Sequence, residues 1–288
     1  MQLIFFGSDQ YSTVALNTIL SNLPGDSRKV SVVTDKHEGG SPVDQLALKH
    51  KLPVSYYPTL PTITKDTIGL CASFDHLIPP AIIQKFAGNL YNLHPSLLPQ
   101  YRNVSPVQYA LALGDKMTGI TLFRISPGID DGEIIAQASE PILASDTTAT
   151  LTPRLFKKGA ELFLQRTVLC KPDLPNKEPF FVNPDTPLIF TKRLKKDSGY
   201  IEWDVLHALL KNQPPKTTSH NILLNLQPTK SLDHLLRALT PWPGIWSLVP
   251  STKGDLRISL ESVKPDITLK IAGKPKAITL KDFEKYYL

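Results

Sequence analysis

The stretch LIFFGSDQYSTVALNTIL, residues 3–20, sets the pattern of the first half of the chain. It begins with a short apolar run that ends in glycine, and the remainder has the length of a helix. The same alternation continues to residue 94. It places further strands at 30–34, 70–74 and 90–94 and helices at 11–22, 42–51 and 79–86. Strands that alternate with helices predict an α/β fold, with a mostly parallel sheet covered on both faces.

Two features follow the last of these strands. The runs ITLFRI (120–125) and EIIAQASEPI (133–142) flank the turn SPGIDDG (126–132), which predicts a hairpin beside the main sheet. Residues 148–168 carry apolar side chains at helical spacing and are expected to form a helix with one buried face. The apolar positions are Leu151, Leu155, Phe156, Leu162, Phe163 and Val168.

A change in composition indicates a boundary between two domains. Residues 171–190 hold five prolines, which fix φ and remove backbone donors, so an extended linker is predicted there. We expect a first domain over 1–170, a linker over 171–191 and a second domain over 192–288. In the second domain the runs IWSLV, LRISLESV, ITLKIA and AITL predict a small β-barrel of the OB kind.

Composition limits the class of protein. Hydrophobic residues make up 41% and charged residues 20%, as in ordinary globular proteins. No apolar run reaches about 18 residues, so no membrane span is expected. The opening MQLIFFGSD already predicts a strand, so no signal peptide is expected. The net charge of +6 is compatible with a polyanionic partner such as RNA.

The cysteines indicate a reducing compartment. Cys71 and Cys170 are too few for a disulfide framework and lack the spacing of a zinc site. We therefore expect no bound metal. We expect a cytoplasmic protein, or one from the mitochondrial matrix if a presequence has been removed.

The densest polar signal lies between residues 92 and 132. Asn92 and His94 end the strand YNLH, and side chains two apart on a strand share one face. This predicts an amide and an imidazole at the carboxyl end of the sheet, where open α/β sheets bind ligands. Asp130 and Asp131 lie in a glycine-bounded turn that can bring a carboxylate there. Aspartates in turns commonly accept hydrogen bonds from backbone amides instead. The occurrence of Asn92, His94 and Asp130 in this order is a more specific signal than any one of these residues alone.

This ordered set resembles the motif of the folate-dependent formyltransferases, whose fold is a Rossmann-like sheet. The matching positions are Asn92, His94, Ser96 to Pro99, Arg102, Pro106, Thr118 to Thr121 and Gly128 to Gly132. FFGSDQYSTVAL (5–16), GYIEWD (199–204) and RALTPWPGIW (237–246) are similar to segments of the methionyl-tRNA branch of that family.

The resemblance implies a reaction in which an amine attacks the formyl carbon of 10-formyltetrahydrofolate. Asn92 and His94 would stabilise the negative oxygen of the tetrahedral intermediate, a contribution that is commonly the largest in catalysis. Asp130 would hold His94 and help move the amine's proton to the leaving folate nitrogen.

The resemblance also implies binding residues and partners. The folate would lie along Ser96, Leu97, Leu98 and Pro99 and the loop 74–80, with Ile78 and Pro79 as apolar walls. His76 in that loop is expected to be exposed and without a role. The methionyl group would lie near Ser8 and Tyr11, and Arg102, Lys192, Arg193, Lys195 and Lys196 would face the initiator methionyl-tRNA. The protein is expected to act as a monomer.

The match departs from the family pattern in two places. Where the family has a longer basic loop after the second strand, residues 34–45 are short and weakly charged, which weakens the expected grip on the tRNA acceptor end. Asn103 stands where glycine is usual, and asparagine tolerates positive φ better than most residues.

Other functions remain open. A formyltransferase for an amino-sugar nucleotide is the main alternative, and a catalytically weak RNA- or folate-binding protein is another. A nicotinamide-dependent dehydrogenase is disfavoured because the first turn, GSDQYS, lacks GxGxxG.

Overall fold

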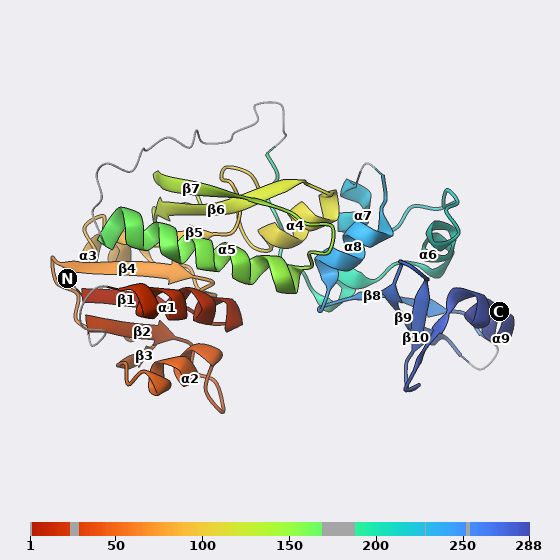
Figure 1. The fold of residues 1–288 in the computed structure, drawn as a ribbon, viewed down its shortest axis with the longest axis horizontal. Coiled ribbons are helices and arrows are strands. Elements are labelled where there is room, and N and C mark those ends of the chain that lie inside the picture. Colours follow the sequence, from red (N-terminus) through yellow and green to blue (C-terminus); the bar gives the residue numbers. More distant parts are fainter. Residues whose placement is uncertain (1, 24–28, 169–187, 228, 252–253) are drawn as a thin grey trace. The chain divides into compact units, whose positions relative to one another are not determined.

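The computed structural model describes residues 2–23, 29–168, 188–227, 229–251 and 254–288 (Figure 1). Cys170 and residues 171–187 of the predicted linker lie outside this part. The chain forms two compact units. Unit 1 comprises Met1–Asn103, Met117–Pro141 and Thr152–Phe190, and unit 2 comprises Val104–Lys116, Ile142–Leu151 and Thr191–Leu288. The domain boundaries at 170 and 192 stay a prediction.

Unit 1 is built on a seven-stranded sheet. Its strands are β1 (Gln2–Phe6), β2 (Val30–Thr34), β3 (Val54–Tyr56), β4 (Thr67–Ala72), β5 (Leu90–His94), β6 (Met117–Arg124) and β7 (Ile134–Pro141). Its helices are α1 (Gln10–Asn22), α2 (Pro42–Lys49), α3 (Pro80–Lys85) and most of α5 (Thr148–Phe163), which continues into the π-helical turn η2 (Leu164–Val168).

The strand order is β3-β2-β1-β4-β5-β6-β7, and β1 to β5 pair in parallel. The expected α/β fold with a mostly parallel sheet is therefore confirmed. The predicted 120–142 hairpin is confirmed, and it is part of the main sheet, because β6 pairs antiparallel with β5 and extends that sheet. Hydrophobic periodicity predicts that two runs form a hairpin but does not say which edge receives it. Strand β3 was missed because it has only three residues.

The order of the strands determines where the polar loops meet. The chain passes from β1 to β2 and β3 on one side, then returns to β4 and β5 on the other. The carboxyl ends of β1 and β4 are therefore the switch point of the sheet, the usual position of a ligand crevice. The loops after these strands are joined there, because the Ser8 N–H donates to the Ser73 carbonyl at 3.1 Å.

Alternate strand residues face opposite layers. On one face, Gly159 of α5 packs so closely that a Cβ atom would lie 2.8 Å from Ile120. Figure 1 shows α1 and α5 crossing in front of the sheet on this side. The opposite face holds a buried cluster that includes Phe6, Phe86 and Leu90, against which side chains of α3 pack. Since His94 is four residues after Leu90 on β5, it belongs to the α3 face.

Unit 2 combines helices with a small antiparallel sheet. Its helical segments are α4 (Pro106–Leu113), η3 (Lys196–Gly199), α6 (Trp203–Leu210), α7 (Ile222–Leu226), α8 (Leu232–Leu239) and α9 (Leu280–Tyr287). Its strands are β8 (Ile245–Val249), β9 (Leu256–Ser262), β10 (Thr268–Ile271) and β11 (Ala277–Thr279), in the order β11-β10-β9-β8. All four β runs predicted for this part are confirmed as strands, and closure into a barrel stays a prediction. None of the described helices of the chain has the length and hydropathy that a membrane crossing requires.

An ion-pair cluster around the buried Glu140 carboxylate joins α5 to the edge strand of unit 1. The Glu140 carboxylate on β7 accepts hydrogen bonds from Arg154 at 2.7 Å and from Lys158, both on α5. Burial alone would raise the pKa of the Glu140 carboxyl, but the bonds from Lys158 and Arg154 hold that pKa below its ordinary value. A carboxyl with a lowered pKa stabilises the folded state above the ordinary glutamate pKa of about 4.3 and loses this effect as pH falls through the folded-state pKa.

We therefore expect Glu140→Gln to lower the free energy of unfolding by roughly 1–3 kcal/mol at pH 7, because hydrogen bonds to a charged group are lost. The difference from wild type should shrink below about pH 4. Urea unfolding at several pH values measures both effects. Glu161→Gln, on the exposed side of the same helix, is the control and should change stability by less than about 0.5 kcal/mol. A deficit in Glu140→Gln that persists undiminished at pH 3 would contradict the assignment.

Candidate active site

His94 ends β5 with its ring held between two oxygens. The side chain is 5% exposed. Its Nε2 lies 2.8 Å from the Tyr101 carbonyl oxygen, which can only accept, so Nε2 carries a hydrogen. Its Nδ1 lies 3.5 Å from Oδ2 of Asp130. A neutral ring in this tautomer presents a lone pair to the carboxylate, so the contact is attractive only when a proton lies between the two groups.

Asp130 reaches His94 because the turn after β6 folds back over the sheet. The turn leaves β6 at the amino end of β5, where the Ile125 N–H donates to the Leu90 carbonyl at 2.8 Å. Asp130 has a φ of 48°, and its Oδ2 accepts the Asn103 N–H at 2.7 Å. Asp131 is exposed and accepts from the Ser126 hydroxyl instead. Of the two aspartates, the structure therefore brings Asp130 to the histidine.

Asn92 completes this group on the same strand. It lies two residues before His94, between its strand partners Cys71 of β4 and Phe123 of β6, and is partly exposed. Its carboxamide therefore projects from the same face as the His94 ring. An amide, an imidazole and a carboxylate are gathered near the carboxyl end of β5.

The loop 95–101 packs closely over β6. Leu97 lies above Gly119, where a Cβ atom would approach its Cδ2 to 2.4 Å. Ser96 and Leu98 are buried, and the Ser96 hydroxyl donates to the Gln100 carbonyl at 2.6 Å. Leu97 and Pro99 are only partly buried. Of the four loop residues expected to contact folate, these two have more accessible surface.

The loop 74–80 has an anchor that the sequence did not reveal. Ile78 packs partly buried on the core cluster of the α3 face, and Pro79 is exposed. The His76 side chain is 40% exposed, as expected, but its Nε2 bonds to the Asp35 carboxylate and its ring stacks on Tyr57 with centroids 4.7 Å apart. No local sequence pattern marks this pair, because 41 residues separate its members.

Asp35 also binds Ser8, in the turn that follows β1. The Ser8 hydroxyl donates to its carboxylate and accepts the Asp75 N–H at 3.2 Å. Burial alone would raise the pKa of the Asp35 carboxyl, but the bonds from Ser8 and His76 hold that pKa below its ordinary value. Tyr11 is partly buried in the first turn of α1, and burial raises the pKa of its hydroxyl.

The basic residues expected to face RNA lie in two places. In unit 1, the Arg102 guanidinium lies over the Phe190 ring, 5.9 Å from its centroid. In unit 2, four exposed residues lie just before η3 or at its start: Lys192, Arg193, Lys195 and Lys196.

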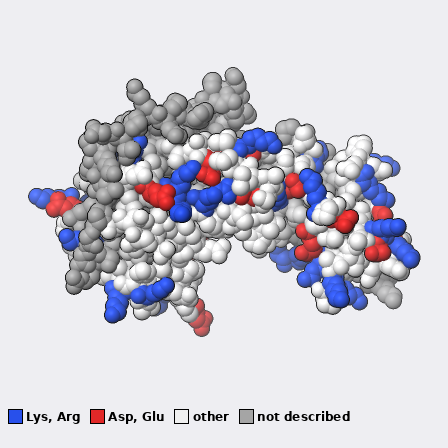
Figure 2. Space-filling model, in the orientation of Figure 1, with Lys and Arg blue, Asp and Glu red and all other residues white. Residues whose placement is uncertain are grey.

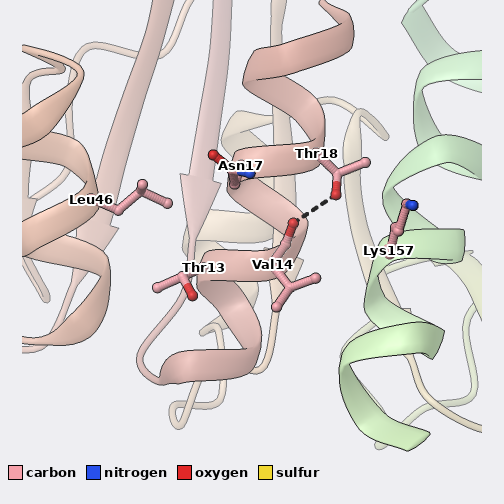
Figure 3. A pocket seen from close by; sticks show the side chains of 6 residues that line it. All are labelled: Thr13, Val14, Asn17, Thr18, Leu46 and Lys157. Atoms are coloured by element: carbon pink, nitrogen blue, oxygen red, sulfur yellow. Dashed lines mark hydrogen bonds between the residues drawn. The ribbon is translucent and has the colours of Figure 1, made fainter. Parts of the chain in front are cut away.

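A cavity of about 450 Å³ opens on the other face of the sheet, between α1, α2 and α5 (Figure 3). Its lining comprises Thr13, Val14, Asn17, Thr18, Leu46 and Lys157. None of these residues belongs to the His94 group. In the part of the chain that the structure describes, no cluster of three or more His, Cys, Asp or Glu side chains could hold a metal ion.

The chain is similar to known proteins over most of its length. Residues 62–167 match the formyl transferase family model. A methionyl-tRNA formyltransferase from Chloroflexus aggregans is 30% identical over 264 residues, which cover 86% of this chain and 76% of that protein. Another, from Corynebacterium diphtheriae, is 29% identical over 284 residues, which cover 91% of this chain and 81% of that protein.

Two solved structures share the fold over nearly the whole chain. The sugar 3N-formyl transferase WlaRD, solved with dTDP and 5-N-formyl-THF, has a TM-score of 0.55 at 17% identity and covers 95% of this chain and 98% of its own. An N-formyltransferase from Helicobacter canadensis, in complex with folinic acid and dTDP-3-aminofucose, has a TM-score of 0.54 at 18% identity, with coverages of 97% and 98%. At these identities the likeness shows the fold alone.

The turn that supports Asp130 can be tested through Asn103, whose φ of 79° agrees with the expectation that asparagine takes over the position of a glycine. Asn103→Gly keeps both the positive φ and the N–H, so we expect the free energy of unfolding to stay within about 0.5 kcal/mol of wild type. Asn103→Val places a β-branched residue in the left-handed region and should cost roughly 1–2 kcal/mol. Denaturant unfolding of both variants measures the difference. Equal stabilities for the two would contradict the described backbone.

Proposed function

Because this chain belongs to the methionyl-tRNA formyltransferase family and is a folate-dependent formyl transferase, we propose that it moves the formyl group of 10-formyltetrahydrofolate to the amino group of methionyl-tRNA. The approach of His94 to Asp130 beside Asn92 carries this proposal. The family supplies the formyl-transfer class and a folate-type donor. The 10-formyl form and the methionyl-tRNA acceptor are the proposed parts.

In the proposed reaction the acceptor nitrogen bonds to the formyl carbon while the carbonyl electrons move to oxygen. The amine then loses a proton, the bond from carbon to the folate nitrogen breaks, and that nitrogen gains a proton. The developing negative oxygen needs donors already in place. We assign the Asn92 carboxamide N–H and the Nδ1–H of a His94 ring protonated on both nitrogens to this oxygen, because the Nε2–H is already bonded to Tyr101.

Asp130 is suited to the proton transfer. Its separation of 3.5 Å from Nδ1 is longer than a hydrogen bond, so this edge of the ring is not committed to the carboxylate. Contacts of catalytic groups often tighten only when substrate is bound. Asp130 can therefore balance the positive charge of the His94 ring and also accept the amine's proton without moving.

The two loops beside this group would hold the folate. Leu97, Pro99, Ile78 and Pro79 supply apolar surface, and the backbone of the loop 95–101 supplies polar groups for a flat ring. Ser96 and Leu98 are buried and would act by supporting the loop.

The distribution of charge supports a polyanionic acceptor. Residues 191–288 hold 16 lysines and arginines against 9 aspartates and glutamates, whereas residues 1–190 hold 16 against 17. The net positive charge of the chain therefore comes from residues 191–288. Figure 2 shows many basic side chains over unit 2, mixed with acidic ones. Arg102, Lys192, Arg193, Lys195 and Lys196 are the proposed phosphate contacts, because cations on the nucleic-acid backbone dominate affinity.

The turn that follows β1 is better suited to an uncharged methionyl side chain than to a phosphate. The carboxylate of Asp9 accepts the N–H groups of Tyr11 and Ser12 at 2.9 Å each. These amides are the donors that a phosphate would use at the start of a helix. Ser8 and Tyr11 remain the proposed neighbours of the methionyl side chain. The monomeric state and the cytoplasmic location stay predictions.

We expect single alanine substitutions at the catalytic positions to lower formyl transfer in protein that remains folded. The loss should be about 10²–10³-fold for Asn92→Ala, an oxyanion donor. It should be about 10²–10⁴-fold for His94→Ala and Asp130→Ala. Steady-state transfer to methionyl-tRNA measures these effects, and Asp131→Ala should stay within a few-fold of wild type. Activities near wild type for all three, or a greater loss at Asp131 than at Asp130, would sink the assignment.

The acceptor is tested directly by incubating the protein and 10-formyltetrahydrofolate with either methionyl-tRNA or an amino-sugar nucleotide. Only methionyl-tRNA should be formylated. Its affinity should fall steeply with salt, and Lys195→Gln and Lys196→Gln should each reduce the log–log slope by about one, since each removes a phosphate contact. Lys49→Gln, on α2 of unit 1, should leave the slope unchanged. Formylation of the sugar nucleotide alone would establish the alternative function.

A further inference from the structure

A row of polar side chains crosses three neighbouring strands of unit 1. The strand register pairs His94 of β5 with Thr121 of β6, and Thr121 with Gln137 of β7. Residues directly opposite each other in neighbouring strands project from the same face of a sheet. All three side chains therefore lie on the face over which the loop 95–101 runs. Only His94 has a part in the chemistry proposed so far.

The Thr121 hydroxyl holds this loop and uses its full hydrogen-bonding capacity. The side chain is fully buried. The hydroxyl donates to the Ser96 carbonyl at 2.6 Å and accepts the Leu98 N–H at 3.0 Å and the Gln137 amide N–H at 2.9 Å. A hydroxyl has one hydrogen and two lone pairs, so none is left for another partner.

Gln137 completes the hold on the loop. Its amide nitrogen donates one hydrogen to the Leu98 carbonyl at 2.9 Å and the other to Thr121. The orientation of the amide is unambiguous, because the Leu98 carbonyl can only accept. Among the residues that the structure describes, the buried amide oxygen has no hydrogen-bond partner. Leaving an acceptor unpaired is unfavourable, so the side chain keeps this orientation for the contacts of its nitrogen.

The loop held in this way is the one that orients the histidine. It starts at His94 and returns to it, because the Tyr101 carbonyl accepts the hydrogen on Nε2 at 2.8 Å. A shift of the backbone at 96–98 would carry Tyr101 with it. The ring would then lose the contact that turns Nδ1 toward Asp130.

We propose that Thr121 and Gln137 are positioning residues for formyl transfer, which fix the loop 95–101 so that Tyr101 holds the His94 ring in its reactive orientation. This inference rests on the proposed role of His94. Neither residue touches the reacting atoms. Thr121 lies within the family motif but had no role assigned to it, and no motif marked Gln137.

The test uses variants that remove the hydrogen bonds with little change in volume. Thr121→Val and Gln137→Leu should each lower kcat roughly 10–100-fold, since small displacements of a catalytic group are costly. The acidic limb of the kcat–pH profile should move, because the surroundings of the imidazole change. Thr121→Ser keeps the hydroxyl and should recover kcat to within about 3-fold of wild type. Thr118→Val, on the opposite face of the same strand, is the control and should retain kcat and the pH profile.

A double-mutant cycle with His94 separates positioning from a merely structural role. In a His94→Ala background, Thr121→Val should lower the residual kcat by less than about 3-fold, because the residue through which it acts is gone. The same 10–100-fold loss in both backgrounds would overturn the proposal. So would unchanged kcat and pH profile in folded Thr121→Val and Gln137→Leu, or a Ser variant as impaired as the Val variant.

The acceptor for these assays is chosen with wild-type protein. If methionyl-tRNA is not formylated but another amine is, the proposed acceptor is wrong and the cycle is run with the amine that reacts. If wild-type protein forms product and His94→Ala is as active as wild type, the role of His94 fails, and the positioning proposal fails with it.

Discussion

The hydrogen bond from His94 Nε2 to the Tyr101 carbonyl is the contact on which the site depends. It fixes one N–H of the ring on Nε2 and leaves Nδ1 for Asp130 and for substrate. The bond closes a loop of seven residues onto the end of a central strand. Thr121 and Gln137 hold that loop, and the 126–132 turn brings Asp130 to the free edge of the ring.

The sheet supports the loop from below. β5 lies between a parallel neighbour, β4, and an antiparallel one, β6, so hydrogen bonds hold its backbone on both sides. On the far face, α5 approaches closely at Gly159, and the cluster of Glu140 with Arg154 and Lys158 ties the same helix to β7. On the face that carries His94, α3 packs against the cluster of Phe86 and Leu90, and the loop 95–101 lies against the ring.

A second polar group lies at the ends of β1, β2 and β4. Asp35 joins Ser8 of the first turn to His76 of the loop 74–80. In the proposed function, Ser8 lies beside the methionyl group and the loop 74–80 forms one wall of the folate site. The Asp35 carboxylate therefore connects the two substrate positions. The short 34–45 segment, which lacks the basic loop of the family, contributes this carboxylate.

The sequence by itself determined the alternation of strands and helices, the four strands of the C-terminal sheet, and the sharing of one strand face by Asn92 and His94. These follow from periodicity and from the geometry of a single strand, which are local properties. The sequence also supplied the ordered motif from which Asp130 was chosen over Asp131. Tertiary structure alone decided the antiparallel addition of β6, the folding of the 126–132 turn back to His94, the pairing of Asp35 with His76, and the hold of Thr121 and Gln137 on the loop. Each of these joins segments that are distant in the chain, and the free energy of such contacts depends on how sheet edges and loops pack, which no local pattern encodes.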